Sequence, residues 1–240
     1  MEKGVIYIVY SAQNNDKFYK ETIHSINTLK KTNPNLPITV FTDKKLNCDL
    51  IDNTVIIPKN EVELRIKHKY LLKSPYEKTL YLDTDTHVNY DINEMFDILD
   101  KYEIALVQDF ARKRTHYSNM MPEYKKIPYA FSEFNCGILL YKKCSNVEKC
   151  IILWEHYFNK YKSQCPYDQP SGRIAFWESG VNIHTLPLEY NRRSKQNRKK
   201  ATLPQYKDIL GKGHLYTRIY HNHGLVNRIP KQFDSEFHYV

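Results

Sequence analysis

The chain has 240 residues, of which 41% are hydrophobic and 26% charged, with 7 glycines and 11 prolines. This composition excludes collagen-like, disordered and disulfide-dense proteins, and the length suits a domain with a large buried core. The formal net charge of +9 indicates a phosphate-containing partner, whether a nucleotide, a nucleic acid or an anionic lipid.

The cysteines and the N-terminal segment bear on the cellular compartment. The five cysteines are odd in number and none forms a C-x-x-C pair, which argues against a disulfide framework and a zinc ribbon. The apolar run at residues 5–10 is too short for the core of a signal peptide, and no run of 18 apolar residues follows. We therefore expect free thiols, no transmembrane segment and a cytoplasmic location.

Short β-branched and aromatic runs alternate with helical patterns through the first half of the chain. Strands are predicted at residues 5–10, 38–42, 54–57, 79–82 and 104–108. Between the first two, we expect a helix that Asp16 caps and whose apolar face comprises Phe18, Ile23, Ile26 and Leu29. This alternation predicts an α/β fold with a mixed, mostly parallel central sheet flanked by helices.

Two later segments have the spacing of a capping box at a helix start. Asp91 with Glu94 accompanies the apolar residues Ile92, Met95, Phe96 and Leu99. Ser145 with Glu148 accompanies a set in 4-3-4-3 spacing, which is typical of one helix face: Val147, Ile151, Trp154, Phe158 and Tyr161. A further strand is predicted at 138–141, whereas 110–132 and 187–210 lack periodicity and predict long functional loops or inserted elements.

The most distinctive local pattern is an apolar strand that ends in two carboxylates, Asp83 and Asp85, separated by Thr84. Ligands of open α/β sheets bind beyond the carboxyl ends of the strands, so both carboxylates should face that crevice. Neighbouring carboxylates repel each other unless a cation lies between them, and Mn²⁺ or Mg²⁺ would suit these oxygen ligands together with nucleotide phosphates. The alternative is an ordinary polar turn, because D-x-D alone is a weak pattern.

Three later motifs follow in order: Phe134-Asn135-Cys136-Gly137, Tyr167-Asp168-Gln169 and Tyr220-His221-Asn222-His223-Gly224. With the two carboxylates, they make the sequence resemble the nucleotide-sugar glycosyltransferases of the GT-A fold. The resemblance is to family 8 of the retaining enzymes, which includes glycogenin and the bacterial lipopolysaccharide galactosyl- and glucosyltransferases. It implies a single GT-A-like (Rossmann-like) catalytic domain over residues 1–240, with a nucleotide-binding half at 1–109 and a sugar and acceptor half at 110–240.

The resemblance also implies roles for individual residues. The metal ligands would be Asp83, Asp85 and His221, the last being the histidine of an H-x-x-G motif, with His223 less favoured. Asp168 and Gln169 would be catalytic at the face of the transferred sugar. The donor-binding residues would be Tyr10, Ser11, Ala12, Lys67, Asp83, Thr84, Asp109, Asn135, Gly137, Gly224 and Arg228.

Several of these residues have simpler alternative roles. Tyr10 could belong to the core, Gly137 could simply start a strand, and Asp168 could be a helix N-cap. Arg65 and Lys69 compete with Lys67 for the cationic role. The sequence also departs from the family pattern six residues after His221, where the usual lysine is Asn227, so that Arg228 or Lys231 would have to replace it.

The implied activity is metal-dependent transfer of a hexose from a UDP-sugar to a hydroxyl of a saccharide, lipid or protein, with retention of anomeric configuration. The alternative is a non-catalytic protein on the same scaffold that binds a nucleotide sugar or a nucleic acid. No zinc finger, helix-turn-helix or RNA-binding aromatic signature supports a nucleic acid, and residues 10–16 lack the glycines of a sugar nucleotidyltransferase.

The positive charge is concentrated at residues 190–207, which hold seven lysines and arginines and no acid. Such a run is commonly a solvated surface. By the family resemblance, this segment would instead border the acceptor.

Overall fold

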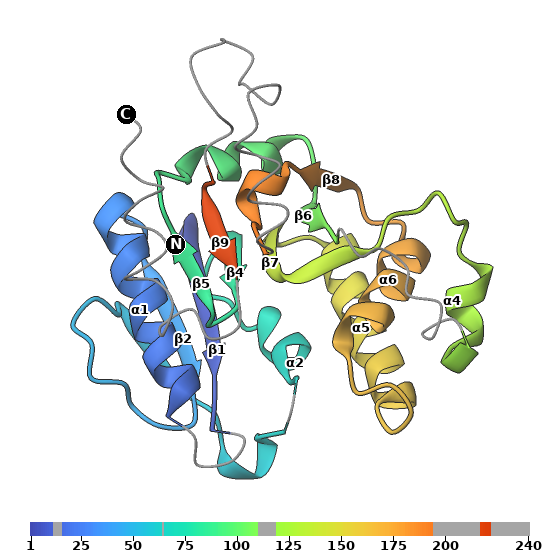
Figure 1. Cartoon of the computed structure of the whole chain (residues 1–240), viewed down its shortest axis with the longest axis horizontal. Helices are drawn as coiled ribbons and strands as arrows, with labels where there is room; N and C mark the ends of the chain where they lie inside the picture. The colour runs from blue at the N-terminus through green and yellow to red at the C-terminus, as the bar shows by residue number, and fades with distance from the viewer. Residues whose placement is uncertain (12–15, 64, 110–118, 194–216, 222–240) are drawn as a thin grey trace.

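The computed structural model describes residues 1–11, 16–63, 65–109, 119–193 and 217–221 of the chain (Figure 1). Its central sheet consists of β1 (Lys3–Val9), β2 (Ile38–Thr42), β3 (Asn53–Ile56), β4 (Lys78–Leu82), β6 (Ile104–Gln108), β7 (Phe134–Lys142) and β8 (Ile183–Leu186). The strand order is β3-β2-β1-β4-β7-β6-β8. Since β7 runs antiparallel to β4 and β6 while the other pairs are parallel, the predicted mixed, mostly parallel sheet is confirmed.

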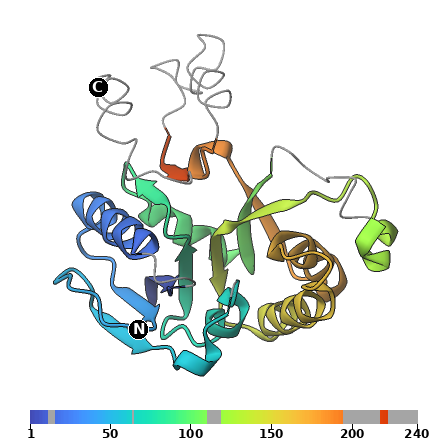
Figure 2. The ribbon, with the colours of Figure 1, turned by 60° about the horizontal axis from the view of Figure 1, so that its bottom comes forward.

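Helices cover both faces of this sheet (Figure 2). The α-helices are α1 (Lys17–Thr32), α2 (Lys67–Leu71), α4 (Pro122–Lys126), α5 (Ser145–Tyr161) and α6 (Asp168–Ser179), and the 3-10 helices are η1 (Lys59–Glu61), η2 (Asn93–Asp100) and η3 (Leu188–Tyr190). Side chains alternate across β1, so Val5 and Val9 pack against α1 and η2, whereas Ile6 and Ile8 pack against α2, α5 and α6. A strand buried on both faces needs this continuous apolar run.

The apolar periodicity predicts the helices better than the capping signals do. All five predicted apolar positions of α5 are buried, and the helix packs against α6, which ends at Gly180 in a left-handed conformation. In α1 the prediction is partly wrong, because Phe18 is exposed while Ser25 is buried. The Ser25 hydroxyl is hydrogen-bonded to the Tyr7 hydroxyl at 2.9 Å and to the Thr86 hydroxyl at 2.7 Å, which gives this helix a polar contact with the strands.

The predicted caps are wrong at all three helix starts. The Asp16 carboxylate pairs with Lys44 at 2.8 Å instead of capping α1. Helix α5 begins at Ser145 itself and has no side-chain cap. The segment with Asp91 is the 3-10 helix η2, and the Asp91 carboxylate accepts a hydrogen bond from the Asn93 backbone at 2.8 Å.

Some elements also differ in extent from the prediction. Strand β7 starts at Phe134, so the Phe134-Asn135-Cys136-Gly137 motif lies inside the strand and does not precede it. Helix α4 lies in the stretch predicted without periodicity, and α2 was not predicted. All five cysteines are free thiols, as expected. Among the described residues, we find no helix with the length and apolar character needed to span a membrane.

Candidate active site

A second, two-stranded sheet lies beside the end of β4 and joins two segments that are far apart in the sequence. It pairs β5 (Thr86–Val88) with β9 (Ile219–His221), antiparallel, and Thr86 is opposite His221 (Figure 1). Asp83 directly follows β4 and Asp85 directly precedes β5. The register of this small sheet therefore places His221 next to both carboxylates.

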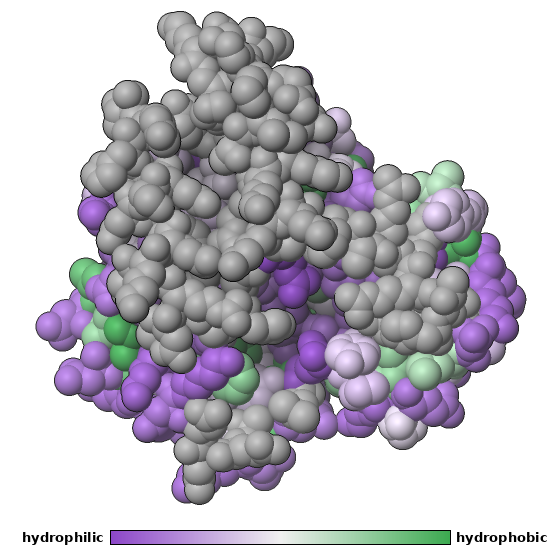
Figure 3. Space-filling view, in the orientation of Figure 1, coloured by the Kyte–Doolittle hydropathy of each residue, from purple (hydrophilic) through white to green (hydrophobic). Residues whose placement is uncertain are grey.

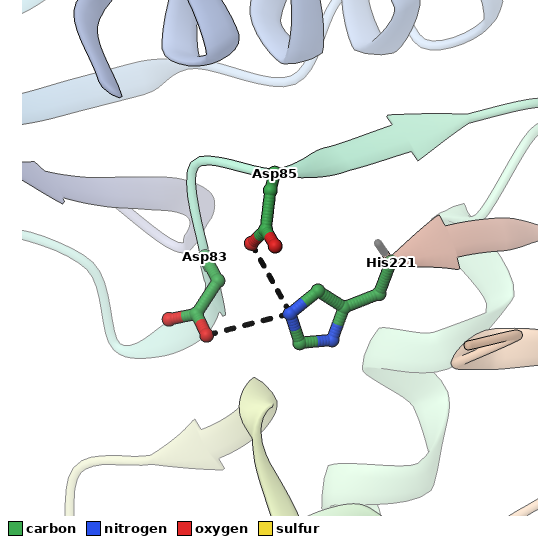
Figure 4. A group of neighbouring side chains, drawn as sticks. All are labelled: Asp83, Asp85 and His221. Atoms are coloured by element: carbon green, nitrogen blue, oxygen red, sulfur yellow. Dashed lines mark ion pairs between the residues drawn. The ribbon is translucent and has the colours of Figure 1, made fainter. Parts of the chain in front are cut away.

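Asp83, Asp85 and His221 form one cluster of potential metal ligands (Figure 4). The Nε2 atom of His221 lies 3.2 Å from Oδ1 of Asp85 and 3.5 Å from Oδ2 of Asp83. One ligand atom from each residue falls within 4.8 Å of the others. His221 and Asp85 are buried, and Asp83 is partly exposed to the cavities beside it.

The other side of the His221 ring is fixed by amide side chains. Its Nδ1 atom lies 3.1 Å from Oδ1 of Asn191, so the ring donates there and leaves Nε2 directed at the carboxylates. Asn191 in turn donates to Oδ1 of Asn135 at 2.8 Å. An outer hydrogen bond of this kind orients a histidine that binds a metal.

The cluster also has the electrostatic character of a cation site. Burial alone would lower the pKa of His221, but the carboxylates of Asp85 and Asp83 outweigh it and raise the pKa to about 9. Burial raises the pKa of Asp83, yet Lys67 and His221 outweigh this and keep it below its usual value. Two ionised carboxylates and an imidazole are a donor set that fits a divalent cation.

Gly137 permits this close arrangement. A Cβ atom at this position would lie 2.2 Å from Cε1 of His221 and 2.6 Å from Oδ2 of Asp83. The Gly137 carbonyl accepts a hydrogen bond from the backbone of Asp83 at 2.7 Å. Glycine is therefore required here by space, and not merely as a strand start.

Two cationic side chains form ion pairs with the carboxylate of Asp168 at the start of α6. The Lys67 ammonium lies 3.1 Å from Oδ2 of Asp168 and 3.5 Å from Oδ1 of Asp83, and it donates to the Cys136 carbonyl at 2.9 Å. The Arg65 guanidinium lies 3.0 Å from Oδ1 of Asp168. Burial raises the pKa of Asp168, but Lys67 and Arg65 outweigh it and lower that pKa, so the group is an ionised carboxylate.

The ion pairs around Asp168 bear on two alternatives that the sequence left open, the N-cap role of Asp168 and the choice of cation. The Asp168 side chain makes no N-cap hydrogen bond, so the N-cap interpretation is wrong. Lys69 pairs with Glu63 at 2.7 Å and lines neither cavity of the site, whereas Arg65 lines both.

Two adjoining cavities share Arg65, Lys67, Asp83, Tyr167 and Asp168 in their walls. The first, here called the apolar cavity, measures about 410 Å³, and its lining includes Ile8, Val9, Tyr10 and Phe18 as well as Asp83, Thr84 and Asp85. The second, the polar cavity, measures about 230 Å³ and is lined by Asp109, Asn135, Gly137, Gln169, Arg193 and His221. Figure 3 shows hydrophilic residues gathered at the centre of this face of the molecule, between the surfaces drawn in grey.

The end of β1 forms part of the apolar cavity. The Tyr10 hydroxyl accepts a hydrogen bond from the Arg65 backbone at 2.6 Å, and Tyr10 also packs against the core. The core interpretation of Tyr10 therefore applies, and its contact with a donor stays a prediction. The Ser11 backbone donates to Asp43 at 3.2 Å, and the Tyr19 hydroxyl donates to the same carboxylate at 2.5 Å. Asp43 was not predicted from the sequence.

Further groups that the sequence motifs did not indicate lie in the wall of the polar cavity or directly behind it. The Gln169 amide donates to Glu133, which immediately precedes the Phe134 motif, and it accepts from Asn135 at 3.4 Å. Arg193, from the basic stretch, lies 3.9 Å from Oδ2 of Asp109. Position next to a motif was the one available signal for Glu133.

Three of the predicted donor-binding residues are not among those that the structure describes. Ala12, Gly224 and Arg228 lie outside the described residues, as do the alternatives His223, Asn227 and Lys231 and residues 194–207 of the basic stretch.

Comparison with known proteins identifies the family. The model of glycosyl transferase family 8 matches residues 11–211. The galactosyltransferase LgtC, in complex with donor and acceptor sugar analogues, is 13% identical with a TM-score of 0.61, over 92% of this chain and 87% of that chain.

Two other solved structures share the fold. The glycosyltransferase GlyE of Streptococcus pneumoniae TIGR4 is 16% identical with a TM-score of 0.61, over 92% of this chain and 54% of that chain. Mouse xyloside xylosyltransferase 1 is 11% identical with a TM-score of 0.57, over 93% of this chain and 98% of that chain. A comparison with curated protein sequences found no match. From its motifs, its GT-A fold and the match to the family model, the chain belongs to glycosyltransferase family 8.

Proposed function

We propose that the chain is a metal-dependent glycosyltransferase that moves a hexose from a UDP-sugar to an acceptor hydroxyl, with retention of anomeric configuration. The main support is the cluster of Asp83, Asp85 and His221 at the junction of two cavities, beside the buried cation Lys67. Retention follows from the retaining family that the sequence resembles.

The two cavities suit the two parts of a nucleotide sugar. In the proposed complex the nucleotide base lies in the apolar cavity near Tyr10 and Phe18, since aromatic rings favour contact with a flat ring system. The diphosphate lies near Asp83 and Asp85, and the hexose occupies the polar cavity, where Asn135, Asp109 and Gln169 offer hydrogen-bonding groups for hydroxyls.

Asp83, Asp85 and His221 would hold the metal. Imidazole is a better ligand for Mn²⁺ than for Mg²⁺, which prefers oxygen and water, so Mn²⁺ is the first candidate. When bound, such an ion would act as a Lewis acid that stabilises negative charge on the departing nucleoside diphosphate.

The chain's own charged groups divide the remaining tasks. Lys67, beside Asp83, and Arg65, beside Asp168, place positive charge near the position where negative charge grows on the leaving group. Asp168 and Gln169 face the hexose, whose transition state carries oxocarbenium-like positive charge that a nearby carboxylate or amide oxygen stabilises. The acceptor, a saccharide, lipid or protein, would approach near Arg193 and the basic stretch that follows it.

Calorimetric titration of UDP with and without Mn²⁺ tests the metal assignment. For the wild-type protein we expect Mn²⁺ to tighten UDP binding by roughly tenfold or more. Asp85→Asn, which keeps the size of the side chain but removes its charge, should abolish this gain. Asp100→Asn serves as the control, because that exposed carboxylate pairs with Lys78 and lines neither cavity. Equal UDP affinity of all three proteins with and without metal would refute the metal site.

Turnover is tested with a panel of UDP-sugars, by measuring the release of UDP with and without added acceptors. We expect slow release from at least one donor even without an acceptor, and the preferred donor identifies the hexose. Inertness toward every donor, with UDP binding intact, would favour the non-catalytic alternative.

A further inference from the structure

We propose that Glu133 is a positioning residue of this active site, which holds the Gln169 amide with its oxygen toward the polar cavity. The inference rests on the proposed function, in which Gln169 faces the transferred hexose. Glu133 is no part of the motifs through which the sequence resembles its family.

Glu133 is placed behind the active site and not in it. The residue lies immediately before β7 and is 0% exposed. One carboxylate oxygen, Oε2, accepts a hydrogen bond from the Tyr124 hydroxyl, and the other, Oε1, accepts from Nε2 of Gln169. Glu133 lines neither cavity, so it acts on a substrate through Gln169.

The chemistry of the two side chains determines the orientation of the amide. An ionised carboxylate only accepts hydrogen bonds, so Gln169 must present its NH₂ group to Glu133. Because the amide is planar, its oxygen then lies on the other side, where Nδ2 of Asn135 is 3.4 Å away in the wall of the polar cavity. The flipped amide would place its oxygen against the carboxylate and repel it.

A buried arginine supports the segment that carries this carboxylate. Arg173, on α6, is 1% exposed and donates to the carbonyls of Pro128 and Phe131, each at 3.0 Å. It thereby ties the chain between Tyr124 and Glu133 to the helix that carries Gln169. Burial raises the pKa of Glu133, while the hydrogen bonds from Tyr124 and Gln169 and the charge of Arg173 oppose that rise.

The consequence for the reaction is electrostatic. A carboxylate behind the NH₂ group polarises the amide and increases the negative charge on its oxygen. That oxygen faces the hexose, where positive charge develops in the transition state, whereas an NH₂ group in its place would repel this charge. Glu133 should therefore affect the chemical step and leave binding of the nucleotide unchanged.

Two substitutions at this position separate positioning from packing. Glu133→Leu removes both acceptors. Glu133→Gln keeps the shape and can keep both hydrogen bonds, because the Tyr124 hydroxyl accepts as well as donates. Tyr124→Phe is the matched control, since it removes the other partner of Glu133 and leaves the bond to Gln169 in place.

Kinetics and UDP binding are measured on each variant. We expect Glu133→Leu to lower kcat by about 10- to 100-fold, the range found for outer-shell partners of reactive groups, with UDP affinity unchanged within about twofold. Glu133→Gln keeps the orientation of the amide but removes the charge, so it should lose less of kcat than Glu133→Leu, and Tyr124→Phe should retain most of kcat. In a Gln169→Ala background, Glu133→Leu should cause no further loss, because residues that act as a unit are not additive. An unchanged kcat in Glu133→Leu, or a fully additive loss, would overturn the proposal.

A second measurement needs no activity and no variant at position 133. Side-chain amide signals of ¹⁵N-labelled wild-type protein are recorded by NMR, and the Gln169 signal is assigned by its loss in Gln169→Ala. We expect its NH₂ protons to exchange with water much more slowly than those of exposed glutamines. Rapid exchange would overturn the contact with Glu133. Slow exchange in a protein that turns over no donor would instead refute the proposed function and leave the contact intact.

Discussion

Position 137 has no space for a side chain, because the cluster of potential metal ligands packs directly against it. A Cβ atom on Gly137 would overlap with the side chains of both His221 and Asp83. These are two of the three potential ligands, and a hydrogen bond holds the side chain of each, His221 by Asn191 and Asp83 by the Tyr81 hydroxyl, which donates to its Oδ1. Neither can move away without loss of a hydrogen bond.

We therefore expect Gly137→Ala to abolish the tightening of UDP binding by Mn²⁺ while the protein still folds. The measurement is UDP titration with and without the metal, together with thermal unfolding. Gly4→Ala is the matched control, because its Cβ would come 2.4 Å from the Tyr76 ring, far from either cavity's lining. That variant should lose stability and keep the response to Mn²⁺. A normal metal response in Gly137→Ala would contradict the geometry described for the cluster.

A second residue-scale feature is the buried histidine of α2. His68 is 1% exposed, its ring centroid lies 4.9 Å from that of Phe158, and neither ring nitrogen has a hydrogen-bond partner among the described residues. Burial lowers the pKa of His68 to about 4. The folded protein therefore favours the neutral ring.

The sign of the resulting pH dependence follows from this pKa. The stabilisation is fully present above pH 6.5, the ordinary pKa of histidine, and is lost as the pH falls toward 4. We expect His68→Leu to remove this loss, on the order of 2 kcal/mol of unfolding free energy between pH 7 and pH 4. Urea unfolding at both pH values measures it, with His156→Leu on the exposed face of α5 as control. Equal acid sensitivity of His68→Leu and wild type would show that His68 is not the source.

At the scale of elements, regular periodicity was a good guide and local capping signals were not. Strands β1, β2, β4 and β6 and the apolar face of α5 were predictable because they are buried along nearly their whole length, whereas β8, which is mostly not buried, was not predicted. A helix cap depends on one or two hydrogen bonds that a tertiary contact can replace. At Asp16 the ion pair with Lys44 does so.

The elements that the sequence did not predict are short and depend on distant partners. Helix α2 has five residues, and β5 and β9 have three each. Their lengths give no measurable period, and β5 exists only through its pairing with β9 near the other end of the chain. Such elements are consequences of the fold and have no local signature.

The same distinction applies to the candidate site. Asp83 and Asp85 could be found because they end a buried strand, and Asp168 because it starts a helix within a recognisable motif. The contacts of Glu133 with Gln169 and of Arg65 with Asp168 join segments far apart in the sequence. No spacing rule connects such residues, so only the folded structure brings them together.

At the scale of the whole molecule, the two predicted halves share one sheet. Strand β6 belongs to residues 1–109, yet it lies between β7 and β8 of residues 110–240. Strand β7 in turn pairs with β4 of the first half. Neither half can complete the hydrogen bonds of its strands without the other, and a single domain stays our prediction.

We therefore expect one cooperative unfolding transition in urea. The chain has two tryptophans, Trp154 and Trp177, and both lie in the second half, whereas far-UV circular dichroism reports on the whole chain. The midpoints of the two signals should coincide. Hydrogen exchange of amides in β1 and β2 provides a probe confined to the first half and should give the same free energy as amides in β7. Separate midpoints would show that residues 1–109 and 110–240 unfold independently.

The pairing of β9 with β5 also has a consequence for the order in which the site is made. Every strand of the main sheet precedes β9 in the chain, so a ribosome has delivered the whole sheet, with Asp83, Asp85 and Lys67, before His221 emerges. A growing chain can therefore form the apolar cavity while the cluster of potential metal ligands still lacks its histidine. Emergence of β9, and not collapse of the core, would then be the event that completes the set of potential metal ligands.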